Sequence, residues 1–317
     1  MIKTYDLICI GAALVDIVAQ VDRYPEKDDE VFVSDLKLLS GGAAANTAYA
    51  CAKLGLKTAF IGKIGRNDIF GSKLVNDFNE VKVNTELLKY SDNYSTGSAY
   101  VALNKEGERR IFAYSGAANH LLKEDIREDE LSLTKTIFLS SLKNLNPFIK
   151  AAEIGKQKKL PIILNPGMLM IEQGFKYIKE LLEKIDILIM SQREFQVLFD
   201  LINLNSNLAV IRKNAMKLFS LGIKAVIVTK GNKGALMMTN ENSELIPPIK
   251  INKVIDTTGA GDAFSAGFIY GFIQNPSFEF EALKHNVKLG NFIAGKCIEK
   301  LGARNGIPDI EEVKFKE

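Results

Sequence analysis

The chain opens with a short apolar run of the kind that forms a buried strand. Residues Asp6–Gly11 read Asp-Leu-Ile-Cys-Ile-Gly, and a glycine ends the run. A continuous apolar stretch of this length, closed by a turn residue, is typical of a parallel strand that is covered on both faces.

Similar runs recur from residue 136 onward, separated by segments with the apolar spacing of helices. The predicted strands are Thr136–Ser140, Pro161–Leu164, Ile185–Met190 and Ala225–Thr229, and the predicted helices are Pro147–Lys158, Gly174–Lys184, Arg193–Phe199 and Leu208–Leu221. This alternation predicts an α/β fold with a mostly parallel sheet and helices on both of its faces.

Two other stretches alternate between apolar and polar positions, as strands with one solvated face do. Residues 31–40 show this pattern once, and residues 98–114 show it twice, on either side of a turn at Asn104–Gly107. The second stretch therefore predicts a β-hairpin. We expect a small antiparallel element inserted into the α/β body, because no linker or repeat divides the chain.

Composition excludes several classes of function. The 317 residues are 47% hydrophobic and 25% charged, which is ordinary for a globular protein. The net charge of +3 is spread without a basic block, so we expect neither nucleic-acid nor membrane binding. Cys9, Cys51 and Cys297 are far apart and predict packing residues rather than a disulfide framework or a zinc site.

The N-terminal segment does not have the pattern of a signal peptide. Asp6 precedes its apolar run and Asp16 follows soon after. No apolar run reaches the roughly 18 residues that a membrane-spanning helix needs. A cytoplasmic enzyme is the resulting expectation.

Small residues stand at the start of a predicted helix in the run Asp256–Ile269. The segment reads Asp-Thr-Thr-Gly-Ala-Gly-Asp and continues with helical periodicity from Ala263. A small-residue turn at a helix N-terminus exposes backbone N–H groups and favours an anion. Asp262 could there accept a proton from a hydroxyl, or it could merely cap the helix.

A second glycine-rich run leads into another predicted helix. Gly41 and Gly42 precede an alanine-rich segment that ends at Leu54-Gly55, a helix-stop signal. Asn46 falls near the first turn, where its amide can bond a ligand hydroxyl as donor or acceptor. An asparagine at a helix start without any ligand is the alternative.

Together, the two runs resemble the signature patterns of the PfkB family of carbohydrate kinases, which includes ribokinase, fructokinase and adenosine kinase. The first pattern fits from Gly41 to Gly65, and the second fits from Asp256 to Ile269. Residues 11–16, 95–97, 229–234 and 302–308 are similar to further family segments. The resemblance implies one ribokinase-like three-layer α/β/α domain over residues 1–317, with an antiparallel lid formed by about 12–36 and 94–114.

The resemblance also implies a reaction and its residues. ATP, with Mg²⁺, would donate its γ-phosphoryl group to an alcohol (hydroxymethyl) group of a sugar or nucleoside. Asp262 would be the general base, and Gly259, Ala260 and Gly261 would supply an anion hole. The implied substrate residues are Leu14, Asp16, Gly41, Gly42, Ala43 and Asn46, and the implied nucleotide residues are Ser191, Thr229, Gly231, Gly234 and Asn291.

Some positions depart from the best-known family members. Glu194 matches the acidic residue near the magnesium ion, but Ser191 stands where the family usually has asparagine. Leu14 and Ala43 differ from ribokinase, since adenosine kinases carry a leucine in the first loop, and fructokinases and 2-keto-3-deoxygluconate kinases share a small residue at position 43. The choice between a nucleoside-like pocket and a fructose-type or ketodeoxy-sugar pocket is open.

Three further features follow from the resemblance. Asp256 and Thr258 match a potassium-binding loop, to which Cys297, Lys300 and Gly302 would add backbone carbonyls. The lid would also form the contact of a homodimer. Arg109 and Arg110, on the hairpin, would face either a substrate phosphate or solvent.

Two other classes of function compete with a kinase. A dinucleotide-binding oxidoreductase would have glycine-rich turns after strands, but no Gly-x-Gly-x-x-Gly follows the first strand. A P-loop kinase is excluded, because the chain has no Gly-x-x-x-x-Gly-Lys-Ser/Thr loop. A catalytically silent ligand sensor on a kinase fold is disfavoured by Asp262.

Overall fold

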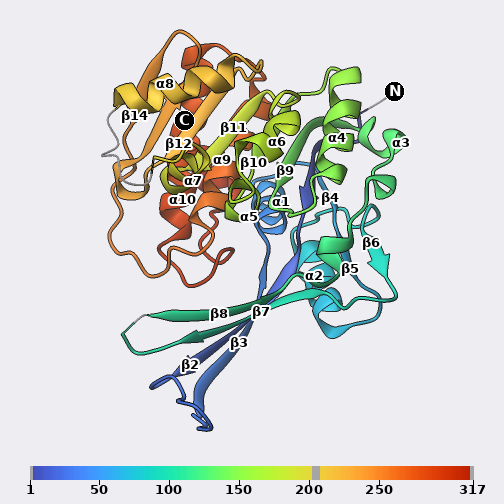
Figure 1. Cartoon of the computed structure of the whole chain (residues 1–317), viewed down its shortest axis with the longest axis vertical. Helices are drawn as coiled ribbons and strands as arrows, with labels where there is room; N and C mark the ends of the chain where they lie inside the picture. Colours follow the sequence, from blue (N-terminus) through green and yellow to red (C-terminus); the bar gives the residue numbers. More distant parts are fainter. Residues whose placement is uncertain (1–2, 107, 202–207, 315–317) are drawn as a thin grey trace.

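An eight-stranded sheet forms the middle layer of the body in the computed structural model, which describes residues 3–106, 108–201 and 208–314 (Figure 1). The strand order is β14-β13-β12-β11-β10-β9-β1-β4. The strands are β1 (Tyr5–Gly11), β4 (Thr58–Ile61), β9 (Thr134–Ser140), β10 (Ile162–Asn165), β11 (Ile187–Ser191), β12 (Ala225–Thr229), β13 (Ala235–Met238) and β14 (Ser243–Ile246). Neighbours from β12 to β4 are parallel, and β13 and β14 add an antiparallel edge.

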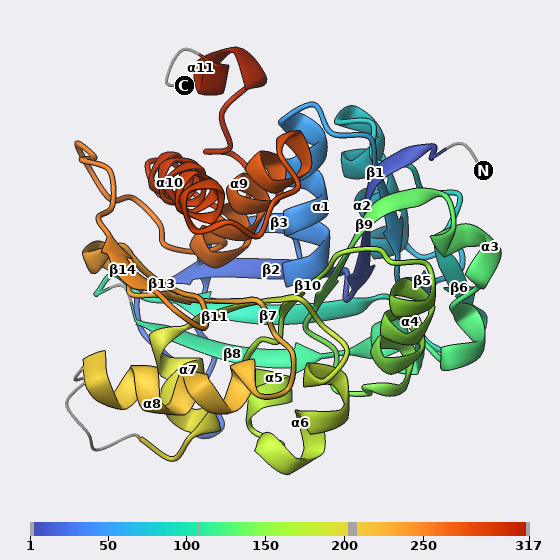
Figure 2. The same ribbon diagram turned by 90° about the horizontal axis from the view of Figure 1, so that it is seen from above.

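Helices cover both faces of this sheet (Figure 2). One face carries α1 (Ala43–Lys53), α2 (Ile69–Glu80), α9 (Ala260–Gln274) and α10 (Phe280–Cys297). The other face carries α3 (Glu128–Leu131), α4 (Asn146–Gln157), α5 (Met168–Ile171), α6 (Phe175–Leu182), α7 (Gln192–Leu198) and α8 (Leu208–Phe219). A short α11 (Ile310–Lys314) lies near the C-terminus.

The first strand explains why this sheet is buried on both sides. Successive side chains of a strand point to opposite faces. Leu7 and Cys9 therefore join the hydrophobic core under α1 and α9, whereas Ile8 and Ile10 join the core under α4 and α6. The three-layer α/β/α architecture predicted from the sequence is confirmed.

A second sheet projects from the body and corresponds to the predicted lid (Figure 1). Its order is β3-β2-β7-β8, with β2 (Leu14–Val21), β3 (Val33–Gly41), β7 (Gly97–Leu103) and β8 (Arg109–Tyr114). The outer pairs β2–β3 and β7–β8 are antiparallel, and the central pair β2–β7 is parallel. A two-stranded parallel ribbon of β5 (Lys63–Gly65) and β6 (Lys89–Ser91) lies at its base.

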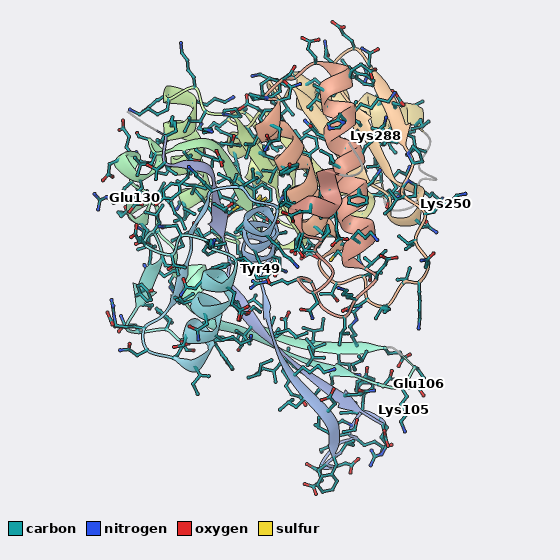
Figure 3. The ribbon with its side chains drawn as sticks, turned by 180° about the vertical axis from the view of Figure 1, so that it is seen from behind. Tyr49, Lys105, Glu106, Glu130, Lys250 and Lys288 are labelled. Atoms are coloured by element: carbon teal, nitrogen blue, oxygen red, sulfur yellow. The ribbon has the colours of Figure 1, made fainter. Side chains whose placement is uncertain are left out.

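The predicted hairpin over residues 98–114 corresponds to β7 and β8, and Figure 3 shows Lys105 and Glu106 at its tip. Gly107 of the predicted turn lies outside the described residues. The strand expected over 31–40 begins later, at Val33, and runs to Gly41, so the sheet extends beyond the lid segment expected to end near 36. None of the helices in the described part of the chain is long and apolar enough to cross a membrane.

Candidate active site

The carboxyl ends of the parallel strands collect the candidate residues at one edge of the sheet. Strands β1, β10, β11 and β12 end at Gly11, Asn165, Ser191 and Thr229. Ligands of open α/β sheets bind in the crevice outside this edge. The lid starts from the same edge, because β2 follows β1 after two residues.

Helix α9 begins at the predicted Gly-Ala-Gly-Asp turn. Gly259 is its N-cap residue with φ +76°, and an added Cβ would lie 2.3 Å from the Cβ of Ala303. Both constraints require glycine at this position. The Ala260 N–H donates to the Thr257 carbonyl at 3.2 Å, and the first bond of the helix runs from the Ala263 N–H to the Gly259 carbonyl at 2.8 Å.

The N–H groups of Gly261 and Asp262 lie ahead of that first helical bond, where a helix has no internal acceptor for them. An added Cβ on Gly261 would meet nothing within 4 Å, so the space beside this residue is open. Two backbone donors at the positive end of the helix dipole can bind an anion there.

Asp262 is a half-buried carboxylate in the first turn of α9. Its Oδ2 accepts a hydrogen bond from Nδ2 of Asn46 at 2.9 Å. Burial raises the pKa of Asp262 to about 7, and the charge of Glu194 adds to this rise, while the Asn46 hydrogen bond and the charge of Arg304 oppose it. The helix-cap alternative is wrong, because Gly259 occupies the cap position and Asp262 lies inside the helix.

Arg304, which directly follows Ala303 in the segment 302–308, was not among the predicted site residues. Arg304 is 7% exposed, and its Nε donates to Oδ1 of Asn46 at 3.0 Å. Asn46 therefore connects Arg304 to Asp262. The only signal in the sequence was an arginine beside a recognised glycine turn.

A second chain of hydrogen bonds supports the turn from the strand side. Asn165 at the end of β10 donates to Oγ of Ser265 at 3.1 Å, and this hydroxyl donates to the Gly261 carbonyl at 3.0 Å. The carboxyl end of the sheet is thereby tied to the first turn of α9.

The predicted substrate residues converge where β2, β3 and α1 meet. An added Cβ on Gly41 would lie 2.7 Å from Oδ2 of Asp16 and 3.1 Å from Cδ1 of Leu14, so the three residues share one face of the lid sheet. Gly42 caps α1 with φ +93°, and Ala43 is its first residue. Burial raises the pKa of Asp16, and the charge of Arg304 opposes this rise.

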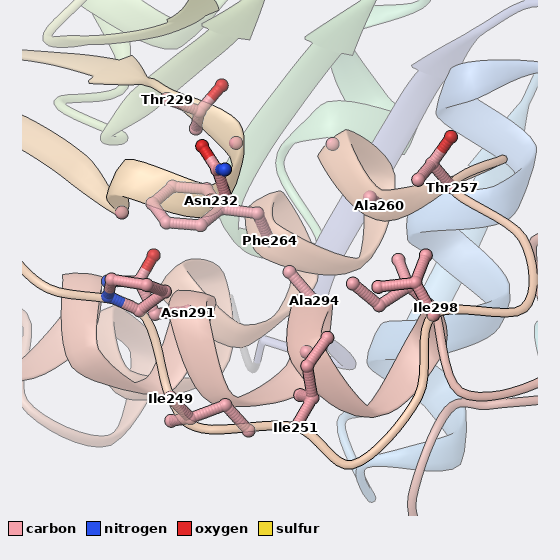
Figure 4. Close-up of a pocket in the computed structure, with 16 residues that line it drawn as sticks. Thr229, Asn232, Ile249, Ile251, Thr257, Ala260, Phe264, Asn291, Ala294 and Ile298 are labelled. Atoms are coloured by element: carbon pink, nitrogen blue, oxygen red, sulfur yellow. The ribbon is translucent and has the colours of Figure 1, made fainter.

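A cavity of about 470 Å³ adjoins the start of α9 (Figure 4). It is lined by Thr229, Gly231, Asn232, Gly234, Pro248, Ile249, Ile251, Val254, Thr257, Ala260, Gly261, Phe264, Asn291, Ala294, Gly295 and Ile298. Four of the five predicted nucleotide residues line it. Asn291 also has a structural task, because its Nδ2 donates to the carbonyls of Ile246 and Pro247 at 3.2 and 2.9 Å.

Ser191, the fifth predicted nucleotide residue, caps helix α7. Its Oγ accepts from the Glu194 N–H at 3.2 Å, and Oε2 of Glu194 accepts from the Ser191 N–H at 2.6 Å. This capping box holds the Glu194 carboxylate at the end of β11. Burial raises the pKa of Glu194, and the hydrogen bonds from Ser191 oppose this rise.

The segments predicted to form a cation loop lie together. Oδ1 of Asp256 accepts from the N–H and Oγ1 of Thr258 at 3.0 and 2.7 Å, and Oδ2 accepts from the Gly302 N–H at 2.9 Å. Burial would raise the pKa of Asp256, but these hydrogen bonds hold it below the ordinary value. The Cys297 carbonyl accepts from the Lys300 N–H at 3.3 Å.

Within the described ranges there is no group of three or more histidine, cysteine or acidic residues that could hold a metal ion. The three cysteines are buried and unpaired with one another, as predicted for packing residues.

Comparisons with known proteins agree with the resemblance seen in the sequence. Residues 5–310 match the pfkB family carbohydrate kinase. The ribokinase of Staphylococcus aureus (strain COL) is 29% identical over 313 residues, which cover 98% of this chain and 99% of that protein. A nucleoside kinase of Methanocaldococcus jannaschii is 26% identical over 311 residues, which cover 98% of this chain and 96% of that protein.

A solved structure extends the agreement to three dimensions. The structure of Arabidopsis thaliana ribokinase complexed with ribose and ATP has a TM-score of 0.87 and 26% identity, and the match covers 98% of each chain. The match to the family spans nearly the whole sequence and all three sheets. The chain therefore belongs to the PfkB family of carbohydrate kinases.

Proposed function

We propose that this kinase transfers the γ-phosphoryl group of ATP to an alcohol group of a sugar or nucleoside, with Asp262 as the general base. The observation that carries the proposal is the position of this half-buried carboxylate. Asp262 stands at the start of α9, which borders the cavity of about 470 Å³, and it contacts Asn46 of the substrate side. A base whose pKa lies near neutrality is well suited to proton transfer at physiological pH.

The start of α9 would act as the anion hole. Gly261 and Asp262 provide the two N–H groups that precede the helical ladder, and Gly259 and Ala260 shape the turn. Phosphoryl transfer needs alignment and charge stabilisation more than covalent chemistry from the protein. Backbone N–H groups that a helix holds in place can stabilise the charge without having to move during the reaction.

The cavity would hold the nucleotide. Its lining combines apolar side chains, such as Ile249 and Phe264, with polar groups at Thr229 and Asn232 (Figure 4). Pockets for small ligands have this composition. The phosphates would extend toward Gly261, which lines the same cavity.

The donor set fits a magnesium ion held jointly by protein, water and phosphates. Glu194 offers a carboxylate, and its charge reaches Asp262, whose pKa it helps to raise. Mg²⁺ prefers hard oxygen ligands and usually keeps several waters. When bound with ATP, the ion would neutralise charge on the phosphates.

The loop of Asp256 and Thr258 fits a potassium ion. The Asp256 carboxylate accepts three hydrogen bonds, whereas a carboxylate has about four acceptor sites. The Gly302 N–H bonds this carboxylate, and Lys300 lies two residues before it, so carbonyl groups of this segment would be the further ligands.

The acceptor pocket would combine a carboxylate with apolar contacts. Asp16 and Asn46 can bond hydroxyl groups, whereas Leu14 and Ala43 offer apolar surface. This mixture favours a nucleoside or a substrate range broader than ribose.

The outer face of the lid supports pairing with a second copy of this chain. Leu38, Ile17, Tyr100 and Phe112 form one cross-strand row, on the face opposite Asp16. Leu38, Tyr100 and Phe112 are 43%, 39% and 70% exposed. An apolar row across four strands is unusual on a solvated surface and is self-complementary in a twofold dimer.

A kinase screen tests the proposed reaction. The purified protein is incubated with ATP, Mg²⁺ and a panel of sugars, ketodeoxy acids and nucleosides, and ADP production is measured. We expect turnover with at least one alcohol and a loss of about 10²–10⁴-fold in Asp262→Asn. Near-wild-type turnover in Asp262→Asn would refute the assignment of the base, and ADP production with no member of the panel would refute the acceptor class.

A further inference from the structure

Arg304 is a buried cation placed among acidic and aromatic groups of several elements. Its guanidinium lies 4.9 Å from the ring centroid of Tyr49 and 5.6 Å from that of Phe78, and Nη1 is 3.6 Å from Oδ2 of Asp77. The charges of Asp16 and Asp262 also act on it. Tyr49 lies on α1 and is labelled in Figure 3.

The hydrogen bonds of Arg304 are distributed unevenly. Neither Nη1 nor Nη2 has a hydrogen-bond partner among the residues that the structure describes, although both atoms are buried. A buried donor without an acceptor destabilises the folded protein, and more so when it is charged. Packing alone therefore does not account for an arginine at this position.

The Arg304 side chain does form one hydrogen bond with Asn46. Nε of Arg304 donates to Oδ1 at 3.0 Å, and Nδ2 of the same amide donates to Asp262 at 2.9 Å. An asparagine whose oxygen is held by a cation must present its amino group on the other side. The amide therefore cannot flip without losing both bonds.

We propose that Arg304 is a positioning residue for phosphoryl transfer, which orients Asn46 and, through it, the carboxylate of Asp262. Arg304 is too deeply buried among protein groups to be assigned a contact with the alcohol itself. Its effect would appear in the rate of the chemical step rather than in the binding of ATP, whose cavity it does not line. This inference rests on the proposed function.

The first test is kinetic. In Arg304→Met we expect kcat for the alcohol to fall by roughly 10²-fold, as small misplacements of catalytic groups do. The KM for ATP should stay within about twofold of the wild-type value, because the nucleotide contacts are untouched. Arg212→Met is the matched control: Arg212 donates to the Thr239 and Asn242 carbonyls of a distant turn, and its loss should leave kcat unchanged.

A double-mutant cycle tests whether Arg304 acts through Asn46. If it does, Arg304→Met combined with Asn46→Ala should be no slower than Asn46→Ala alone, since coupled residues are non-additive. Fully additive losses would overturn the proposal, and so would a folded Arg304→Met variant with wild-type kcat. Wild-type protein that phosphorylates no alcohol would instead defeat the proposed function.

Chemical rescue provides a readout that a packing role would not move. A cavity of about 280 Å³, lined in part by Arg304, Tyr49 and Asp77, leads to the guanidinium site. Millimolar guanidinium should restore part of the kcat of Arg304→Ala, whereas methylammonium at the same concentration should not. If Arg304→Ala does not fold, Arg304→Lys takes its place: a retained fold with reduced kcat supports positioning, and full activity contradicts it.

A crystal structure of the Arg304→Met variant gives an outcome independent of turnover. We expect the Asn46 amide to rotate away from Asp262 or to occupy two orientations. An Asn46–Asp262 hydrogen bond unchanged from 2.9 Å would argue against the proposal even if kcat were reduced.

Discussion

Nη1 of Arg109, at the start of β8, donates a hydrogen bond to Oγ1 of Thr258 at 3.1 Å. The contact joins the lid to the loop that precedes the start of α9, across 149 residues of sequence. Arg110, the next residue, lies on the other face of the strand, with its guanidinium 4.1 Å from the ring centroid of Tyr24. The sequence pattern did not distinguish these two arginines. Because successive side chains of a strand point to opposite faces, they lie on opposite sides of β8.

Removal of Arg109 is expected to weaken closure of the lid. Arg109→Ala should raise the KM for the alcohol severalfold with a smaller effect on kcat, because the lid would enclose the acceptor and does not carry the proposed base. Stability should change by less than about 1 kcal/mol, since the contact is exposed. Arg110→Ala is the matched control in steady-state kinetics, and an equal rise in KM there would contradict a specific role for Arg109.

The pH dependence of activity should follow Asp262. Burial raises its pKa to about 7, and the base must be ionised to accept a proton. We therefore expect kcat/KM to fall below pH 7 in proportion to the protonated fraction and to level off above it. A rate profile measured from pH 5 to 9 checks this, and an acid limb near pH 4 would contradict it.

The same carboxylate should reduce the stability of the folded protein at high pH. A folded-state pKa above the unfolded value favours the protonated native form, so this contribution to stability is present below the unfolded pKa and is lost as pH rises toward 7. Asp262→Asn should therefore stabilise the ligand-free protein at pH 8, by at most roughly 4 kcal/mol, since one pKa unit corresponds to about 1.36 kcal/mol.

Asp256 provides the control with the opposite sign. Its pKa is lowered by hydrogen bonds from Thr258 and Gly302, which outweigh burial. The corresponding stability is present above the unfolded pKa and is lost as pH falls through the folded pKa. Asp256→Asn should thus destabilise the protein at pH 8 in urea unfolding. If both variants shift in the same direction, the electrostatic explanation is wrong.

The two glycines of the α9 turn should differ when each is changed to alanine. Gly259→Ala meets both the φ of +76° and a Cβ contact of 2.3 Å with Ala303, so we expect loss of stability by about 1–3 kcal/mol together with loss of activity. Gly261→Ala places its Cβ in open space and should keep the unfolding midpoint. Its methyl group would crowd the anion site and lower kcat, and normal turnover in this variant would count against the anion hole.

Disruption of the outer face of the lid should dissociate the proposed dimer. Phe112→Asp places a charge in the apolar row, and sedimentation velocity should then show a monomer. Ile111→Asp is the control from the opposite face of the same strand, and it should retain the mass of the wild-type protein. A wild-type monomer would rule out the dimer.

The body strands were predictable because a strand buried on both faces must be apolar throughout. The predicted strand Ala225–Thr229 has the bounds of β12. The predicted strand Thr136–Ser140 begins two residues after the first residue of β9 and ends at the same residue. Strand β2 was less visible: no strand was predicted between Gly11 and residue 31, yet β2 begins at Leu14. Its side chains point alternately to the site and to the outer face of the lid. The burial of each β2 side chain therefore depends on its pairing with β3 and β7 and has no simple pattern in the local sequence.

Short sequence patterns were enough to locate two helix starts and the polar residues beside them. Glycines at positions 42 and 259 are required by the backbone there, and Asp262 and Asn46 follow them at short, readable distances. That these residues meet is visible only in the folded chain, where hydrogen bonds join positions 216 and 258 residues apart. Local patterns report the period and ends of an element, whereas the Arg304–Asn46–Asp262 connection depends on how α1, α9 and the C-terminal segment pack, which no short pattern encodes.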